Sequence, residues 1–101
     1  MRKYAARVDA NQSAIVRALE GMGALVRDCS RMGDGFPDLL VLWRGQWLLA
    51  ECKDGSKPPS RRKLTPDQVL WHAEAKQRGG KVYVLETEDD ALAMLGARRA
   101  A

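Results

Sequence analysis

Two continuous apolar runs lie in the middle of the chain and are separated by a short polar turn. The first run covers residues 38–43 and is opened by Asp38. The second covers residues 47–53 and ends in Glu51-Cys52-Lys53, with Arg-Gly-Gln at 44–46 between the two runs. Two short apolar runs joined by a glycine-containing turn predict a β-hairpin. Because neither run alternates with polar residues, we expect both faces of these strands to be covered, as in the central strands of an α/β sheet.

A helix is predicted before the hairpin. It begins near residues 9–11, where Asp9 or Asn11 can cap it, and it ends at Gly21 and Gly23. Its expected inward stripe consists of apolar residues at helical spacing: Ile15, Leu19 and Met22.

The remaining segments complete an α-β-β-β-α-β order followed by a C-terminal helix. In chain order they are a strand over 24–30, a loop over 31–37, a loop over 54–64, a helix ending at 79–80, a strand over 81–86 and a helix from 87. The middle helix has a well-defined start, with Thr65 as N-cap, Pro66 at the first helical position and Gln68 closing a capping box. This order predicts an α/β fold whose mixed central sheet is flanked by helices.

Length and composition are consistent with one small globular domain spanning residues 1–101. The chain has 101 residues, of which 46% are hydrophobic and 30% charged. A domain of this size has a modest core, so a homodimer is plausible. No signal peptide is visible and no apolar run reaches the ~20 residues that a bilayer requires, so we expect no membrane association. Cys29 and Cys52 are interpreted as reduced, buried thiols of a cytoplasmic protein.

The chain carries a net charge of +4, which favours an anionic partner. Four cations fall within seven positions of the second loop: Lys57, Arg61, Arg62 and Lys63. Such a run is often only a solvated loop. Here it directly follows the acidic end of the hairpin, and this position favours phosphate binding.

The open end of the hairpin gathers three charged residues. With the turn centred near Gly45, residues whose numbers sum to about 89 or 90 face each other, and Asp38 and Glu51 satisfy this condition. Glu51 and Lys53 are two positions apart and therefore point to the same face of their strand. We expect these three side chains to converge beside an otherwise apolar hairpin.

This convergence suggests a metal site. Two neighbouring carboxylates repel each other unless a proton or a cation lies between them, and a set of oxygen ligands favours Mg²⁺ or Mn²⁺. A bound Mg²⁺ can polarise a phosphodiester and activate water, while Lys53 can orient that water or stabilise the transition state. The alternative is that Lys53 forms only a structural ion pair with Glu51 or Asp38.

Four segments together resemble the VRR-NUC (virus-type replication–repair nuclease) family of the PD-(D/E)XK nuclease superfamily. The resemblance extends from about residue 8 to 95, and its segments are Asp-Ala-Asn-Gln at 9–12, Gly-Asp-Gly-Phe-Pro-Asp at 33–38, Glu-Cys-Lys-Asp-Gly at 51–55 and Pro-Pro-Ser-Arg-Arg-Lys-Leu-Thr-Pro-Asp-Gln at 58–68. A PD…EXK pattern alone is degenerate. Its combination with a downstream Leu-Thr-x-x-Gln helix start is far more specific.

The resemblance implies a restriction-endonuclease-like core and a set of site residues. Asp38 and Glu51 would bind the metal together with the Cys52 carbonyl, and Lys53 would be the catalytic lysine. Gln68 matches a glutamine beside the active site, although its role in the capping box is equally sound. The superfamily often places a glutamate on the first helix. Here Gln12 or Asn11 is nearest to that position, with Asp9 a turn earlier, and these residues form a possible first-helix part of the site. One-metal catalysis is therefore favoured.

The sequence thus predicts an endonuclease that hydrolyses phosphodiester bonds in DNA with Mg²⁺, for which Mn²⁺ can substitute. A small homodimer with two active sites suits branched DNA such as a Holliday junction, in phage or prophage replication or repair in the cytoplasm of a bacterial host. The alternative is a catalytically silent nucleic-acid-binding or assembly module with the same fold. His72, the only histidine, is interpreted as a packed or solvent-facing residue rather than a general base.

Overall fold

The computed structural model describes residues 11–96, which form the predicted order of helices and strands. The elements are α1 (Gln12–Gly21), β1 (Leu25–Asp28), β2 (Leu39–Trp43), β3 (Gln46–Cys52), the 3₁₀ helix η2 (Pro59–Arg61), α2 (Pro66–Gln77), β4 (Val82–Leu85) and α3 (Glu88–Met94). The sequence did not predict η2, which lies inside the loop expected over 54–64. The α/β fold class and the C-terminal helix are confirmed.

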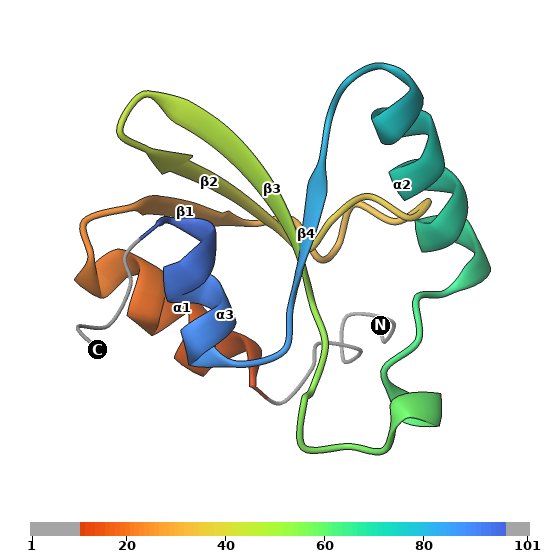
Figure 1. Ribbon diagram of the computed structural model, residues 1–101, viewed down its shortest axis with the longest axis horizontal. Coiled ribbons are helices and arrows are strands. Elements are labelled where there is room, and N and C mark those ends of the chain that lie inside the picture. The colour runs from red at the N-terminus through yellow and green to blue at the C-terminus, as the bar shows by residue number, and fades with distance from the viewer. Residues whose placement is uncertain (1–10, 97–101) are drawn as a thin grey trace.

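The four strands form one mixed sheet in the order β1-β2-β3-β4 (Figure 1). β1 and β2 are antiparallel, as are β2 and β3, whereas β3 and β4 are parallel. The hairpin register pairs Leu39 with Ala50, so facing residue numbers sum to 89 as predicted. Arg44 and Gly45 both have positive φ, of 49° and 82°, which is typical of the two-residue turns that match the twist of a hairpin.

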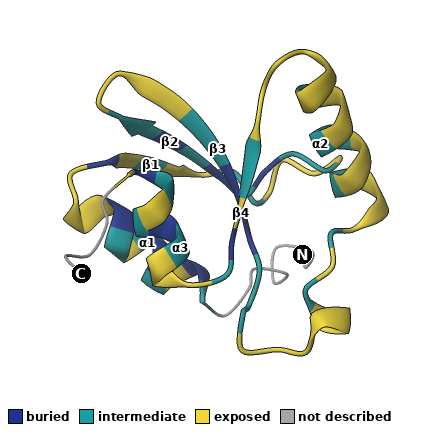
Figure 2. Ribbon diagram, viewed as in Figure 1, coloured by how far each residue is buried: buried dark blue, intermediate teal, exposed yellow. Residues whose placement is uncertain are grey.

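One face of the sheet carries the hydrophobic core. Helices α1 and α3 pack against each other and against this face, where the buried residues are concentrated (Figures 1 and 2). Ile15 and Leu19 of α1 are fully buried, as the stripe predicted. Met22 is exposed instead, because it follows the last turn of the helix as its C-cap residue.

The opposite face of the sheet is only partly covered. Because paired residues share a face and successive residues alternate, Leu40, Leu42 and Leu49 point away from α1 and α3. These three side chains are half-buried, while Leu25 and Trp47 on the same face are 65% and 63% exposed. α2 stands away from α1 and α3, and none of its residues is buried (Figure 2). The expectation that both faces are covered is therefore confirmed for one face only.

The helix starts differ in how they are capped. α2 has the predicted capping box between Thr65 and Gln68, with Pro66 in its first turn. Asn11 is the N-cap residue of α1, but its side chain makes no capping hydrogen bond. Asn11 thus holds the predicted N-cap position without side-chain capping, and Asp9, the other candidate, lies outside the described residues.

Two further expectations concern the thiols and the membrane. Neither Cys29 nor Cys52 forms a disulfide, and Cys52 is buried whereas Cys29 is only half-buried. Among the helices within residues 11–96, none has the length and apolar character needed to cross a bilayer.

Candidate active site

Asp38 and Glu51 lie at the open end of the β2–β3 hairpin. Asp38 directly precedes β2, and the hairpin register continues to place it opposite Glu51. The Cys52 backbone N–H donates a hydrogen bond of 2.8 Å to Oδ2 of Asp38, which fixes this carboxylate against β3. A cleft of about 380 Å³ opens beside them, and its lining includes Asp38, Cys52, Lys53 and Gln68.

Glu51 does not line this cleft and is contacted by side chains of α2. Its side chain is 0% exposed, and burial of a carboxylate is costly unless donors or cations surround it. Nε2 of Gln68 donates to Oε2 of Glu51 at 2.8 Å, and Nε2 of His72 lies 3.3 Å from Oε1. Both carboxylate oxygens of Glu51 are therefore engaged by residues one helical turn apart.

Gln68 links this carboxylate to the lysine. Nζ of Lys53 donates to Oε1 of Gln68 at 3.0 Å, while the amide of Gln68 donates to Glu51. The same Oε1 also accepts the Thr65 backbone N–H at 2.9 Å, as the capping box requires. Both interpretations of Gln68, as a residue beside the site and as a helix-capping residue, agree with this geometry.

His72 contacts the candidate site through Glu51, and the sequence reasoning did not include it. Its side chain is 16% exposed and contacts Glu51 from the second turn of α2. Burial lowers the pKa of His72 below its ordinary value of 6.5, and the positive charge of Lys53 lowers it further. A signal was present in the sequence, because His72 follows Gln68 by four positions and must share its face of the helix.

The loop before Asp38 packs against the first two turns of α2. Gly35 has a φ of +81°, and a Cβ at this position would collide with the backbone of Asp67. Phe36 and Trp71 make an edge-to-face contact with ring centroids 5.2 Å apart. The glycine and the aromatic residue of the Gly-Phe-Pro-Asp segment thus bring α2, and with it Gln68, to the cleft.

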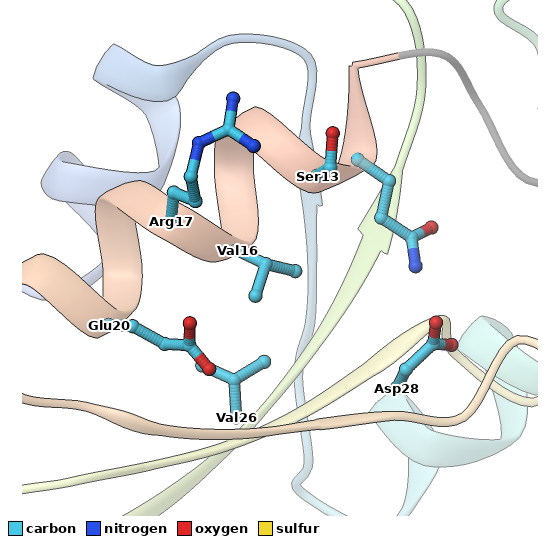
Figure 3. A pocket seen from close by; sticks show the side chains of 7 residues that line it. Ser13, Val16, Arg17, Glu20, Val26 and Asp28 are labelled. Atoms are coloured by element: carbon cyan, nitrogen blue, oxygen red, sulfur yellow. The ribbon is translucent and has the colours of Figure 1, made fainter.

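The first-helix candidates lie in two different surroundings. Nδ2 of Asn11 donates to the backbone carbonyls of Lys53 at 2.9 Å and of Glu86 at 2.8 Å. Gln12 is 3% exposed and lines a separate cavity of about 450 Å³ between α1 and β1, where its side chain contacts Asp28. Figure 3 shows the other side chains that line this cavity. Neither residue is among those lining the cleft beside Asp38, and Asp9 lies outside the described residues.

The four cationic side chains of the basic loop differ in their contacts with the rest of the protein. Lys57, Arg61 and Lys63 are exposed. Arg62 instead donates from Nε to the carbonyl of Lys57 at 2.6 Å and forms an ion pair of 3.5 Å with Glu86. Arg62 therefore fastens the loop to the end of β4, while the other three side chains face solvent.

Asp38 and Cys52 line the cleft, whereas Glu51 precedes Cys52 on β3 and is fully buried, outside the cleft lining. The chemistry of these oxygen donors fits a hard divalent cation. Asp38, Glu51 and the backbone carbonyl of Cys52 offer oxygen atoms, which Mg²⁺ and Mn²⁺ prefer over the nitrogen and sulfur ligands typical of zinc. Within residues 11–96, no group of three or more His, Cys, Asp or Glu side chains could hold a metal. Since Mg²⁺ usually keeps several waters and binds through one or two carboxylates, two acids and a carbonyl are sufficient.

Comparison with solved structures identifies the family. A structure described as a VRR_NUC domain is 32% identical in sequence, covers 84% of this chain and 89% of its own chain, and superposes with a TM-score of 0.63. This chain belongs to the VRR-NUC family. No protein-family model and no curated protein matches the sequence.

Membership of the VRR-NUC family implies a PD-(D/E)XK-type nuclease fold and a divalent metal. It also implies binding of DNA. The matched fold confirms the restriction-endonuclease-like core that the sequence predicted, with its mixed sheet of four strands and three α-helices.

Proposed function

We propose that this VRR-NUC domain is a Mg²⁺-dependent DNA endonuclease whose catalytic residues are Asp38, Glu51, Lys53 and Gln68. The observation that carries the proposal is the connection of Lys53 to Glu51 through Gln68, on the strand that faces Asp38 across the hairpin. These residues come from three separate segments, and core packing alone does not require three charged groups at one end of a sheet.

Each side chain has a role that follows from its contacts. A Mg²⁺ ion held by Asp38, Glu51 and the Cys52 carbonyl would supply Lewis acidity and lower the pKa of a bound water. The Cys52 N–H keeps Asp38 turned toward β3. Gln68 orients the amine of Lys53, whose positive charge stabilises the negative charge that develops on the phosphate.

The basic loop supports binding of the DNA backbone. The loop that follows β3 carries three exposed cations, Lys57, Arg61 and Lys63. Their charges are accessible to the phosphates of a bound DNA backbone. Arg62 contributes by holding the loop in place.

Branched DNA, such as a Holliday junction, is the proposed substrate, with cleavage by a homodimer. Two copies related by a two-fold axis would present two active sites for strands of like polarity. The uncovered face of the sheet supports such an interface, because Leu25 and Trp47 expose large apolar side chains there. The proposed setting is phage or prophage replication or repair inside a bacterial cell, which rests on analogy with small members of the family.

The dimer is testable independently of the chemistry. Trp47→Lys would place a charge on the exposed apolar face and should convert the protein to monomers in analytical ultracentrifugation. Met32→Lys is a matched control, because Met32 is also exposed but lies in the loop outside the sheet. A wild-type protein that sediments as a monomer at high concentration would rule out the dimer.

The decisive experiment is cleavage of a labelled panel of linear, flapped and four-way DNA with Mg²⁺, with Mn²⁺ and with EDTA. We expect metal-dependent cutting that favours branched DNA. Asp38→Ala and Glu51→Ala should abolish cutting but leave DNA binding intact, since removing a negative charge reduces repulsion of phosphate. Cutting by either variant at the wild-type rate would show that the site is assigned wrongly, and equal cutting of linear and four-way DNA would exclude structure selectivity.

One observation favours the alternative of a catalytically silent DNA-binding module. Gln68 and His72 already contact both oxygens of Glu51. To bind a metal, the Glu51 carboxylate would have to rotate or use its remaining lone pairs. A silent module would bind DNA without cutting any member of the panel, whether Mg²⁺ is present or not.

A further inference from the structure

His72 lies at the most deeply buried charged group of the described residues. Glu51 is 0% exposed and His72 contacts it with Nε2 only 3.3 Å from Oε1. The neighbouring oxygen, Oε2, receives the amide of Gln68 at 2.8 Å. Burial of a carboxylate without partners is strongly destabilising, so each of these contacts stabilises the Glu51 side chain in this position.

We propose that His72 is a positioning residue for the divalent metal site, because its Nε2–H donates to Glu51 and sets the orientation of that carboxylate. The inference rests on the proposed function, since it treats Glu51 as a metal ligand. It assigns His72 a task distinct from that of Gln68, because the two residues contact different oxygens of the carboxylate. Contacts on both oxygens restrict rotation of the carboxylate group about its Cγ–Cδ bond.

The direction of this hydrogen bond follows from the chemistry of the two groups. An ionised carboxylate can only accept, so the ring must carry its hydrogen on Nε2. The separation of 3.3 Å between Nε2 of His72 and Oε1 of Glu51 is compatible with this donation. Donation of this kind by a neighbour of a metal ligand orients the ligand in many metalloproteins.

The construction of α2 explains why two residues of one helix carry out this task. Gln68 and His72 are four positions apart, so their side chains leave the same face of α2 one turn after another. Because no residue of α2 is buried, the helix is not locked in place by a hydrophobic core of its own. The position of α2 relative to Glu51 therefore depends on these polar contacts and on the packing of α2 against Gly35 and Phe36.

Two amide variants separate the donor from the bulk of the ring. In His72→Gln the side-chain nitrogen is as many bonds from Cβ as Nε2 of histidine, so the donor to Glu51 is retained. In His72→Asn the nitrogen is one bond shorter and does not reach the carboxylate. Lys76→Asn is the matched control, because Lys76 follows one turn later on α2 and lines the adjacent cleft with His72.

The measurement is binding of Mn²⁺ to the full chain without DNA, by isothermal titration calorimetry, with thermal unfolding recorded for every variant. We expect His72→Asn to weaken Mn²⁺ binding by roughly 10- to 100-fold, the usual effect of losing a neighbour that orients a metal ligand. His72→Gln and Lys76→Asn should remain within about threefold of wild type, well inside that range. In cleavage assays His72→Asn should need correspondingly more Mn²⁺ for half-maximal activity, while the rate at saturating Mn²⁺ changes little.

The outcomes distinguish this inference from the proposed function. Wild-type Mn²⁺ affinity in a folded His72→Asn protein would overturn the role of His72 and leave the nuclease assignment standing. Equal weakening in His72→Asn and His72→Gln would also overturn it, because the ring rather than the donor would then matter. If the wild-type protein neither binds Mn²⁺ nor cuts DNA, the proposed function fails and the inference fails with it.

Discussion

The side-chain amide of Asn11 donates a hydrogen bond of 2.9 Å to the backbone carbonyl of Lys53, which is 42 positions away in the chain. A second donation reaches the carbonyl of Glu86 at 2.8 Å. Asn11 therefore ties the start of α1 to the points where β3 and β4 have just ended. One of these two points is the residue proposed to act in catalysis.

Asn11→Ala should destabilise the fold and displace Lys53. Loss of both hydrogen bonds leaves two part-buried carbonyls without this donor, so we expect the free energy of unfolding to fall by roughly 1–3 kcal/mol, as measured by urea denaturation. Ser13→Ala on the exposed side of the same helix is the control and should have little effect. If Asn11 were instead a metal ligand, Asn11→Asp would strengthen Mn²⁺ binding; we expect it to weaken folding, because a carboxylate would then face two carbonyls.

Gly35→Ala should undock α2 from the cleft. The new Cβ would collide with the backbone of Asp67, so the first turn of α2 must shift and Gln68 should lose its hydrogen bonds with Lys53 and Glu51. We expect cleavage to fall at least about tenfold, which corresponds to about 1.4 kcal/mol in the activation barrier.

Gly33→Ala is the matched control for this variant. Gly33 also has a positive φ, of +76°, but no atom lies within 4 Å of a Cβ built there. Gly33→Ala therefore introduces the strain of a positive φ at a non-glycine residue but no collision with α2. Equal loss of cleavage in Gly33→Ala and Gly35→Ala would mean that backbone strain, and not the packing of α2 against Gly35, is responsible.

Arg61 and Lys63 should differ from Arg62 in their effect on DNA binding. Arg61→Ala with Lys63→Ala should weaken binding of DNA and reduce the slope of log affinity against log salt by about 0.9 for each phosphate that the double variant no longer neutralises. Arg62→Ala should mainly loosen the loop, because its guanidinium binds Lys57 and Glu86. Fluorescence anisotropy over a salt series measures both effects, and an unchanged slope in the double variant would show that the loop is only solvated.

Asp28 should make stability depend on acid pH. Its burial raises the pKa, but hydrogen bonds from Ser30 and Gln12 and the charge of Arg31 outweigh this and hold the pKa below the ordinary value of 3.8. The unfolded chain therefore binds the proton more readily, so the stabilisation is present above pH 3.8 and is lost as pH falls through the lower pKa of the folded state.

Asp28→Asn tests this expectation. The variant should be less stable than wild type at pH 7, and the difference should shrink as the pH falls below 3.8, as followed by thermal unfolding. Ser30→Ala should reproduce part of the effect, because Oγ of Ser30 donates to Asp28 at 2.6 Å. A stability difference between wild type and Asp28→Asn that is constant from about pH 7 to about pH 3 would contradict the assignment.

The features that the sequence predicted are those governed by local rules. The turn at Arg44 and Gly45 and the two-residue alternation of the strands fixed the hairpin register, and with it the placement of Asp38 opposite Glu51. The Thr65–Gln68 capping box fixed the start of α2 because its hydrogen bonds connect residues three positions apart. The resemblance to the VRR-NUC family added the expected fold, which the matched structure confirms.

What the tertiary structure decided are the contacts between segments that are distant in sequence. The sequence suggested Asn11 as a helix cap or a site residue, yet its donors are taken by carbonyls beyond the ends of β3 and β4. His72 was interpreted as a packed or solvent-facing residue, whereas in the structure its side chain contacts Glu51, 21 positions earlier in the chain. Apolar patterning and turn chemistry set each element and its faces. Which polar atoms then meet depends on how helices and sheet pack in space, and no local rule encodes that arrangement.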